Sequence, residues 1–442
     1  MKLLRACHVR LELSSRAIVL LMYYLTYGEL ARVNCVSKTF GGAVQIVVSS
    51  LARKFELSGH QLGTRWLRQM ELAACNARVA MSFWRTRVYP CAGLIVDKNG
   101  ACFSFGERRV VLGREVSTDA RYRELVTPRR VGGALLSVRV SQVAVGIDFA
   151  LTMSIDGGLF SWGSNREGQL GLGDLITRLM PTPVPSFDGR FPTCIAASRT
   201  RALAISGGNV YVWGGSMRRP NVCIPFRLVG PAEASAPFVS AGVGTYIGLA
   251  IDAHGSVWRW GDDWGRLEAN KLTPALYRVP TLQHAVQVSV GLRHSHVLLA
   301  SGAVYACDHF STEDLPILVA GLDNASVSAV FVGHKTSFAI SAAGEFFAWG
   351  AGKRGELATG TRDPRRPDPA RVEALHSHKI VSIGGGVGLI AIAISADTGN
   401  EEFYTWGRRC VYTSDGPACA YTSNGVFSTL IEPRRFELGT DH

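Results

Sequence analysis

Residues 158–163 read GLFSWG, a short apolar run that follows a glycine turn and closes on an aromatic–glycine step. The same arrangement of turn, apolar run and closing pair occurs seven times along the chain. The seven segments are 100–106 (GACFSFG), 158–163 (GLFSWG), 208–214 (GNVYVWG), 255–261 (GSVWRWG), 302–308 (GAVYACD), 344–350 (GEFFAWG) and 399–407 (GNEEFYTWG). Self-similarity at this spacing indicates a repeat architecture, in which small units stack to bury a common core.

Two further elements recur with the same period. After each closing pair and a loop, a proline opens an extended segment, and most of these segments are followed by a β-rich stretch with alternating apolar positions, such as 143–153 and 288–299. The prolines are Pro128, Pro183, Pro225, Pro274, Pro316, Pro369 and Pro433. Proline has no backbone donor and therefore suits the first residue or the edge of a strand. Three to four short strands per unit predict a mainly β fold, a seven-bladed β-propeller over residues 88–442.

The order of these elements also predicts how the ring closes. The seventh unit ends with its proline segment near Phe436, where the pattern stops. Its missing strand is therefore expected from the start of the repeat region, near residues 88–97. Pairing the two ends of the repeat region in this way would leave no free sheet edge.

The aromatic residues of the closing pairs are predicted to form the core between units, because they recur at one phase of the repeat. These propeller-core residues are Trp162, Trp213, Trp260, Trp349 and Trp406. The fifth unit carries Cys307–Asp308 in place of the aromatic–glycine pair. We therefore expect that unit to be weaker or specialised.

The second unit carries a family resemblance. Residues 158–174 (GLFSWGSNREGQLGLGD) resemble the repeat of the regulator of chromosome condensation family, and 344–360, 255–267 and the first unit match it less completely. The resemblance extends over residues 88–438. It implies a seven-bladed propeller that serves either as a guanine-nucleotide exchange factor or, more often, as a binding platform.

Charge is concentrated at the N-terminus. The chain has a formal net charge of +12, and residues 1–87 contain 13 Lys and Arg against 4 Asp and Glu, so the repeat region is nearly neutral. A near-neutral propeller argues against a nucleic-acid partner. The ten cysteines form no C-x-x-C pair, which suits a reducing compartment, and the apolar stretches are too short to span a bilayer. We expect an intracellular protein of the cytoplasm or nucleus.

Residues 1–50 are predicted to form a small helical domain with three short amphipathic helices. The pattern Tyr24-Leu25…Glu29-Leu30-x-Arg32-Val33-x-x-Val36-Ser37-Lys38-x-Phe40 resembles an F-box, although the chain has LSSR at residues 13–16 where that family usually has Leu-Pro-x-Glu. The resemblance implies docking onto a Skp-type adaptor in a cullin-based ubiquitin ligase. The adaptor-binding residues would be Leu13, Ile18, Leu21, Leu25, Leu30, Val33, Val36 and Phe40. The alternative is a helical cap packed on the propeller.

Residues 51–87 are predicted to be a helical linker. Thr64 is a plausible N-cap for a helix over 64–84, and Trp66, Leu67, Met70 and Ala74 share one stripe of it. Such a helix would pack the small domain against the propeller.

No catalytic constellation is recognisable. Residues 163–168 have P-loop spacing but lack the following Lys-Ser/Thr pair, so they are predicted to be a turn. His294 and His296 point to one face of a strand, which permits metal binding in principle, but no third ligand is identifiable. We therefore expect no catalytic residue, no metal site and no cofactor.

These observations favour a non-catalytic substrate receptor of a Skp–cullin–F-box ubiquitin ligase that binds an unknown protein target. Candidate target-binding loops are residues 107–126, 218–222 and 353–368. Two alternatives stay open: a nucleotide exchange factor for a Ran-type small GTPase, and a chromatin-binding propeller. The second of these would use a basic patch made of Arg108, Arg109, Arg114, Arg121, Arg123, Arg129 and Arg130.

Overall fold

The structure is a computed structural model of the whole chain. It describes residues 78–81, 92–117, 122–185, 187, 191–216, 219–230, 236–245, 247–261, 276–291, 294–308, 316–362, 365–385, 388–408 and 429–438. The sheets of the protein belong to one compact unit, which comprises residues 67–154 and 158–442. The predicted adaptor-binding residues lie outside the described residues.

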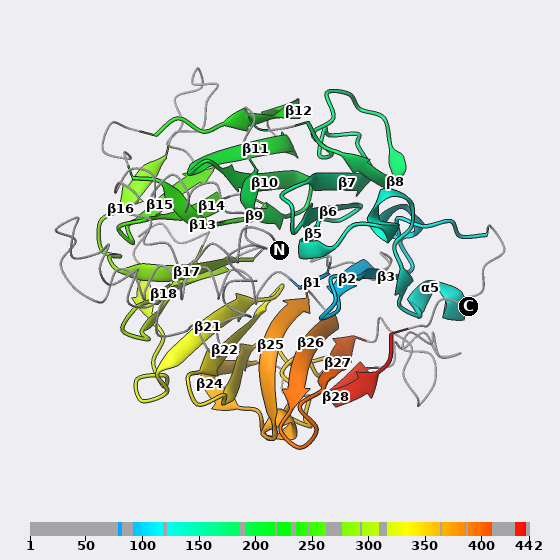
Figure 1. Ribbon diagram of the computed structural model, residues 1–442. Coiled ribbons are helices and arrows are strands. Elements are labelled where there is room, and N and C mark those ends of the chain that lie inside the picture. The colour runs from blue at the N-terminus through cyan, green and yellow to red at the C-terminus, as the bar shows by residue number, and fades with distance from the viewer. Residues whose placement is uncertain are drawn as a thin grey trace, which may run out of the picture. The chain divides into compact units, whose positions relative to one another are not determined.

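The described residues form seven four-stranded antiparallel sheets, here called blades 1 to 7, arranged around a common centre (Figure 1). Blade 1 holds β1 (Val79–Met81), β2 (Ala92–Val96), β3 (Cys102–Gly106) and β4 (Arg129–Arg130); blade 2 holds β5 (Val140–Val145), β6 (Phe149–Ser154), β7 (Leu159–Gly163) and β8 (Arg178–Pro183); blade 3 holds β9 (Pro192–Ala197), β10 (Arg201–Ser206), β11 (Asn209–Ser216) and β12 (Arg219–Arg227). The mainly β, seven-bladed propeller predicted from the repeat is confirmed.

The remaining blades follow in chain order. Blade 4 holds β13 (Phe238–Val243), β14 (Ile247–Asp252), β15 (Val257–Gly261) and β16 (Tyr277–Val279); blade 5 holds β17 (Ala285–Val290), β18 (His294–Leu299), β19 (Val304–Asp308) and β20 (Ile317–Leu318); blade 6 holds β21 (Val327–Val332), β22 (Thr336–Ser341), β23 (Phe346–Gly350) and β24 (Arg366–Arg371); blade 7 holds β25 (His378–Gly385), β26 (Gly388–Ser395), β27 (Glu401–Arg408) and β28 (Thr429–Phe436). The short helices are η2 (Arg109–Val111), α5 (Tyr122–Val126), η3 (Gly133–Leu136) and η4 (Glu373–Leu375).

Each apolar run that ends at an aromatic–glycine step is a strand, as the alternation of side chains predicts, and the structure makes it the third strand of its blade. The β-rich stretch expected to be one strand is instead a hairpin. Residues 143–153, for example, contain the end of β5, a turn at 146–148 and most of β6. The glycine within the stretch makes the turn, because Gly146 N–H bonds the carbonyl of Phe149 at 2.9 Å.

The recurring prolines that lie among the described residues are on or beside the fourth strand, which is the outer edge of each blade. Pro225, Pro369 and Pro433 sit inside β12, β24 and β28, so they do not open those segments as expected. An edge strand tolerates proline because one side of it has no partner strand to receive an N–H group.

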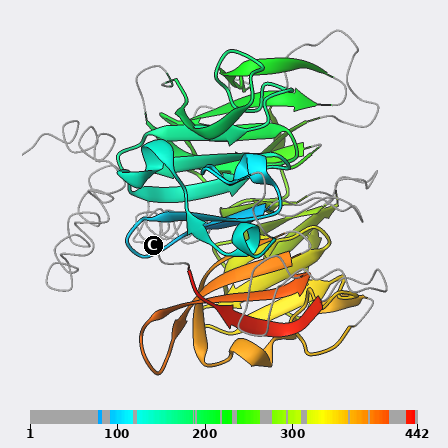
Figure 2. The same cartoon turned by 90° about the vertical axis from the view of Figure 1, so that its right-hand side faces the viewer.

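The ring does not close by the predicted exchange of a strand. All four strands of blade 7 come from residues 378–436, and residues 92–96 are the second strand of blade 1. Blade 1 lies between blades 2 and 7 in both views (Figures 1 and 2). The prediction was wrong because it counted units from the aromatic run, whereas each blade begins two strands earlier with its inner strand.

The prediction of a linker helix is wrong at β1, the first strand of blade 1. Val79–Met81 form β1, which pairs antiparallel with β2, so the helix expected over 64–84 does not extend over these residues. Blade 1 therefore begins before the boundary expected at residue 88. The backbone groups of this short segment gain ladder hydrogen bonds from β2, and such tertiary pairing overrides a weak helical preference.

Blades 1 and 7 meet through an ion pair and an apolar cluster. Arg78 binds Glu401 with both terminal guanidinium nitrogens, at 2.6 and 2.9 Å, and also bonds the carbonyl of Val96. Behind it Ile95 and Phe105 of blade 1 pack with side chains of blade 7. The partners in blade 7 are Ile390, Ile392 and Phe436.

Other junctions bury larger apolar clusters between neighbouring blades. One cluster joins Phe149 and Leu151 of blade 2 to Tyr211 and Trp213 of blade 3. All five of the recurring tryptophans are buried, with at most 6% of their surface exposed; they are Trp162, Trp213, Trp260, Trp349 and Trp406. Burial of such large rings on both sides of a junction is the main apolar contribution to holding the blades together.

Buried amides complete two junctions near the centre. Gln142 on β5 donates to the carbonyl of Thr193 and accepts from the N–H of Ile195, both at 3.2 Å. Gln287 on β17 does the same with the carbonyl and the N–H of Val330, at 2.9 and 2.8 Å. A glutamine amide carries one donor and one acceptor side by side, so it pairs with an inner strand as a peptide group would. Within the described part of the chain, no helix has the length and apolarity needed to cross a bilayer.

Candidate functional site

The irregular segments of each blade gather at its two ends. The turn between the first and second strands and the loop between the third and fourth strands lie at the same end, here called the loop end. In blade 2 the N–H of Ser164 bonds the carbonyl of Asp148 at 2.7 Å, and in blade 6 the N–H of Ala351 bonds the carbonyl of Lys335 at 2.9 Å. Turn and loop therefore form one continuous surface in these two blades.

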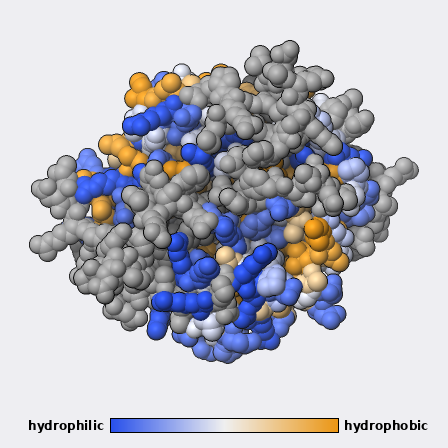
Figure 3. Space-filling view, turned by 180° about the vertical axis from the view of Figure 1, so that it is seen from behind, coloured by the Kyte–Doolittle hydropathy of each residue, from blue (hydrophilic) through white to orange (hydrophobic). Residues whose placement is uncertain are grey.

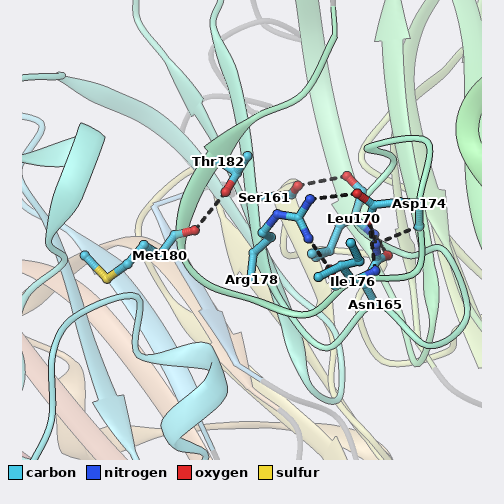
Figure 4. A network of polar contacts seen from close by, with 8 residues as sticks. All are labelled: Ser161, Asn165, Leu170, Asp174, Ile176, Arg178, Met180 and Thr182. Atoms are coloured by element: carbon cyan, nitrogen blue, oxygen red, sulfur yellow. Dashed lines mark hydrogen bonds and ion pairs between the residues drawn. The ribbon is translucent and has the colours of Figure 1, made fainter.

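Residues 164–177 of blade 2 form a loop that is held by the buried side chain of Asn165 (Figure 4). Its Oδ1 accepts from the N–H of Leu170 at 3.0 Å, and its Nδ2 donates to the carbonyl and to Oδ1 of Asp174 at 2.8 and 3.0 Å. Ser161 on β7 donates to the carbonyl of Leu170 at 2.8 Å. The two halves of the loop are thus tied to each other and to the sheet.

Asp174 and Arg178 fix the end of this loop. Asp174 Oδ1 accepts from the N–H of Ile176 at 2.9 Å, while Arg178 binds Oδ2 at 2.7 Å and donates to the carbonyl of Ile176 at 2.8 Å. The hydrogen bond from the Ile176 N–H, followed by the contacts with Arg178 and Asn165, holds the pKa of the Asp174 carboxyl below its ordinary value. Both backbone polar groups of Ile176 are therefore occupied within the loop.

This fixed backbone presents large apolar side chains to solvent. Leu175 is 49% exposed and Ile176 is 62% exposed. Figure 3, which shows one face of the molecule, shows the hydrophobic side chains of the coloured residues in several separate clusters. Exposed aliphatic side chains on a rigid loop are a common feature of protein-binding surfaces.

Tryptophans of the following blade clamp the loops at the loop end. The indole N–H of Trp162 bonds the carbonyl of Val111 at 2.8 Å, that of Trp213 bonds Gln169 at 3.0 Å, and that of Trp406 bonds Glu356 at 2.9 Å. These three tryptophans therefore have a second role besides filling the core. Each hydrogen bond holds the loop of one blade against the tryptophan of the next blade.

Glycine is required beneath two of these indoles. A Cβ on Gly113 would lie 2.7 Å from Nε1 of Trp162, and one on Gly171 would lie 2.8 Å from Nε1 of Trp213. Both residues have positive φ, at 61° and 72°. The third loop of this kind has Ala358 in the same place after a leucine, also with a positive φ of 55°, which is an uncommon conformation for alanine.

The three loops predicted to bind a target have different structures. Residues 107–126 contain η2 and α5, and residues 353–362 form a loop of the same kind as that of blade 2. Residues 218–222 are not a loop as expected, because Arg219–Val222 are the first part of β12. Residues 107–126 thus lie between β3 and β4 and most of 353–368 between β23 and β24, whereas residues 366–368 already belong to β24. That any of these segments binds a target stays a prediction.

A half-buried carboxylate joins the loop ends of blades 1 and 2. Nε of Arg108 lies 3.0 Å from Oδ1 of Asp148, which sits in the turn between β5 and β6. Burial raises the pKa of the Asp148 carboxyl above its ordinary value, against the opposing effect of Arg108 and Arg166. The basic residues named for a nucleic-acid patch thus include one that is paired with an acid.

The histidine pair of blade 5 lies in a polar core. Nε2 of His294 and Nε2 of His296 both bond the hydroxyl of Ser337 on β22, at 2.9 and 2.8 Å. Burial and, second, His294 lower the pKa of His296 to about 3, so its imidazole is neutral. Among the described residues, no group of three or more His, Cys, Asp and Glu side chains is arranged to hold a metal ion.

The inner strands surround a cavity of about 200 Å³. Its lining is mainly small apolar residues of β5, β9, β13, β17, β21 and β25, such as Val143, Ala197, Val243 and Val288. No cluster of reactive side chains faces it among the residues that line it. The cavity fits the open centre of a propeller better than an active site.

The repeat pattern includes the blade 2 loop but predicts no role for its individual side chains. Asn165, Asp174 and Arg178 act together through contacts that depend on the loop geometry, and only the spacing of Asn, Gly and Asp in GSNREGQLGLGD hinted at them. The exposure of Leu175 and Ile176 had no signal in the sequence. Two adjacent aliphatic residues are equally consistent with a buried segment and with an exposed one.

Comparison with known proteins agrees with this architecture. The model of the regulator of chromosome condensation (RCC1) repeat matches residues 156–205 and 343–392. The Ultraviolet-B receptor UVR8 of Arabidopsis thaliana is 28% identical over 274 residues, which cover 57% of this chain and 62% of that protein. The human E3 ubiquitin-protein ligase HERC2 is 28% identical over 311 residues, which cover 63% of this chain and 6% of HERC2. The match thus spans less than two thirds of either relative.

A solved structure shows the same fold. Yeast RCC1 (Prp20), in its crystal structure with Kap60, has a TM-score of 0.62 with 18% sequence identity, over 84% of this chain and 86% of that chain. The chain therefore matches the RCC1 repeat over these two segments, and its fold is the propeller of that solved structure. Each matched repeat runs from the third strand of one blade to the second strand of the next, so the sequence repeat and the blade are out of phase.

Proposed function

We propose that this protein is a non-catalytic substrate receptor of a Skp–cullin–F-box ubiquitin ligase. Residues 1–50 would form the adaptor-binding domain, and the propeller would bind the target protein through its loop end. The observation that carries the propeller part is the rigid blade 2 loop, whose internal hydrogen bonds leave Leu175 and Ile176 exposed. A surface that is already ordered loses little conformational entropy when a partner binds.

Two further observations support the proposal. The pattern from Tyr24 to Phe40 resembles an F-box, and its segment carries the excess of positive charge that an acidic adaptor would attract. HERC2, one of the relatives, is by name an E3 ubiquitin-protein ligase. We assign residues 51–78 to a linker between the two parts and begin the propeller at Val79.

Co-purification with a Skp-type adaptor tests the proposal. The full chain should retain the adaptor, and the double variant Leu25→Asp with Leu30→Asp should lose it, because two charges would replace the apolar stripe of the predicted helices. Ile317→Asp, at a 70% exposed position of blade 5, is the matched control and should retain the adaptor. Equal thermal unfolding of the three proteins would show that the propeller is intact.

An adaptor that fails to bind the full chain, or binds both variants equally, would refute the ligase role. The alternative is guanine-nucleotide exchange on a Ran-type small GTPase, and the same preparations distinguish it. An exchange factor would accelerate the release of labelled GDP from the GTPase, with or without the Leu25 and Leu30 substitutions. A chromatin-binding propeller would instead retain nucleosomal DNA in a strongly salt-dependent manner.

A further inference from the structure

We propose that Arg114 and Arg129 of blade 1, here called the arginine pair, form a binding site for a phosphate monoester carried by a peptide side chain. Arg114 lies in the loop between β3 and β4, and Arg129 is the first residue of β4, so both belong to the loop end of the blade. The inference goes beyond the ligase role proposed above and does not depend on it.

The two arginines lie on the same face of blade 1. Arg129 pairs directly with Ser104 of β3, and directly opposed residues of an antiparallel ladder point to one face of the sheet. Ser104 donates a hydrogen bond to the carbonyl of Leu112, so the loop segment that begins there covers this face. A Cβ built on Gly113 would lie 2.9 Å from Cγ1 of Val131, two residues after Arg129 and therefore on the same side. The arginine that follows Gly113 is thus brought to the side chain of Arg129.

Arg114 has few protein partners for a guanidinium group, which carries five N–H donors. Among the described residues its one hydrogen bond joins Nη2 to the carbonyl of Glu124 at 3.2 Å, and its Nε is buried without a hydrogen-bond partner. Burial and, second, the charge of Arg129 lower the pKa of Arg114 to about 10, against the weaker opposing effect of Glu124. The group is still charged at neutral pH, and the repulsion from Arg129 exceeds the attraction to Glu124.

The neighbouring arginines of blade 1 are in a different situation. Arg108 binds the carboxylate of Asp148, and Arg109 and Arg130 donate to nearby backbone carbonyls. Arg129 is exposed, and neither member of the arginine pair forms an ion pair with a carboxylate among the described residues. The arginine pair is therefore the part of this basic surface where two positive charges repel each other without a bound acid.

Two adjacent guanidinium groups suit a doubly charged anion. A phosphate monoester carries a charge of about −1.5 to −2 at pH 7 and three strong acceptor oxygens, so it can accept hydrogen bonds from both guanidinium groups at once. Its binding would replace the repulsion between the arginines with attraction to the shared anion. A carboxylate carries one charge and would balance only one of the two arginines.

The surroundings of the arginine pair favour a phosphate that is presented by a peptide. Sites for free small molecules are concave and enclose most of the ligand, whereas the central cavity is lined by neither arginine and Arg129 is exposed. A nucleic acid gains affinity from several singly charged phosphates in a row, and the neighbouring arginines already contact protein groups. One phosphorylated side chain matches a site of two arginines.

Fluorescence anisotropy on the full chain tests the proposal. The first probe is a short labelled peptide of glycine and serine with one central phosphoserine, the second is the same peptide without phosphate, and the third is a labelled single-stranded oligonucleotide. The phosphopeptide should bind, an excess of inorganic phosphate should displace it, and the unphosphorylated peptide should not bind. Arg129→Gln should weaken phosphopeptide binding by at least about tenfold, because a charge-assisted contact is lost.

Two further variants separate the site from the general charge of the protein. Arg139→Gln removes the same charge from an exposed arginine whose Nε bonds the carbonyl of Asn99, and should change binding by less than about twofold. Glu124→Gln keeps the backbone carbonyl that Arg114 uses but removes the competing negative charge, so it should strengthen binding by about two- to threefold. Equal thermal unfolding of the variants would show that the propeller is intact.

Three outcomes would overturn the proposal: no binding of the phosphopeptide, equal binding of the unphosphorylated peptide, or a loss of binding no greater for Arg129→Gln than for Arg139→Gln. Oligonucleotide binding that is tighter than phosphopeptide binding and that Arg129→Gln abolishes would also overturn it, by assigning the arginine pair to nucleic acid. The result is separable from the adaptor experiment. An adaptor that binds without any phosphopeptide binding removes this inference only, and phosphopeptide binding without an adaptor removes only the ligase role.

Discussion

Blades 2 and 5 have the same four-stranded topology, but at the loop end the core of blade 2 is apolar and the core of blade 5 is polar. Blade 2 places Phe149, Leu151, Trp162 and Gly163 on the paired rows of β6 and β7. At the equivalent paired positions of blade 5, β18 and β19 carry polar or small residues. These are His294, His296, Cys307 and Asp308.

The difference shows what the tryptophan–glycine step does. Blade 5 forms its four strands without that step, so a sheet does not depend on it. In blade 2, a Cβ on Gly163 would collide with the carbonyl oxygen of Asp148, and Trp162 bonds a loop of blade 1. The step therefore serves the contact of a blade with its own turn and with the preceding blade, and blade 5 uses its freed positions for a polar core.

Removal of an indole clamp should have the largest effect. Trp213→Ala takes away a buried ring and the bond to Gln169, and should lower the free energy of unfolding by about 3–5 kcal/mol. Cys307→Ala, at the corresponding row of blade 5, should cost less than about 1 kcal/mol because only a sulfur atom is lost. Urea denaturation followed by circular dichroism measures both. Similar losses for the two variants would contradict the role assigned to the clamp.

The polar core of blade 5 should make stability depend on pH. Burial, with a smaller effect of His294, lowers the pKa of His296 from 6.5 to about 3, so the unfolded chain takes up the proton first as the pH falls. The stability from this group is complete above pH 6.5 and is lost between pH 6.5 and about 3, at up to about 1.4 kcal/mol per pH unit.

His296→Gln isolates this contribution, because glutamine does not titrate and retains a hydrogen-bonding group near Ser337. We expect urea midpoints measured from pH 7.5 to pH 5 to fall less steeply for this variant than for the native chain. The corresponding position of blade 2 is occupied by Leu151, which does not titrate. Equal slopes for the two proteins would show that His296 is not the group responsible.

The smallest effect concerns a backbone conformation shared by blades 2 and 6. Ala358 has a φ of 55°, and the equivalent Gly171 has a φ of 72°. Ala358→Gly should therefore relieve backbone strain. After the greater entropy of glycine in the unfolded chain is included, the substitution should stabilise the protein by about 0.5–1 kcal/mol. Gly171→Ala should have the opposite sign, because its Cβ would approach Trp213. Thermal unfolding measures both, and destabilisation by Ala358→Gly would contradict the strain argument.

Local patterns predicted the parts of the fold that depend on neighbouring residues. Apolar alternation in segments such as 159–163 specifies a strand with a buried face, and each of the seven runs is a third strand. The phase of the blades was missed because β1 is three residues long and its strand character arises from pairing with β2. The hydrogen bonds of Asn165, Asp174 and Arg178 were missed for a related reason, since they join residues whose approach is set by the path of the loop.

The amino-acid sequence by itself determined the number of blades, the position of the third strand in each and the departure of blade 5 from the repeat. These features follow from short-range periodicity, which is set by which side chains alternate along a strand. Only the tertiary structure decided that blades 1 and 7 meet through Arg78 and Glu401, and that Leu175 and Ile176 face solvent. Both depend on which surfaces meet after residues far apart in the chain have been brought side by side, and no local pattern contains that information.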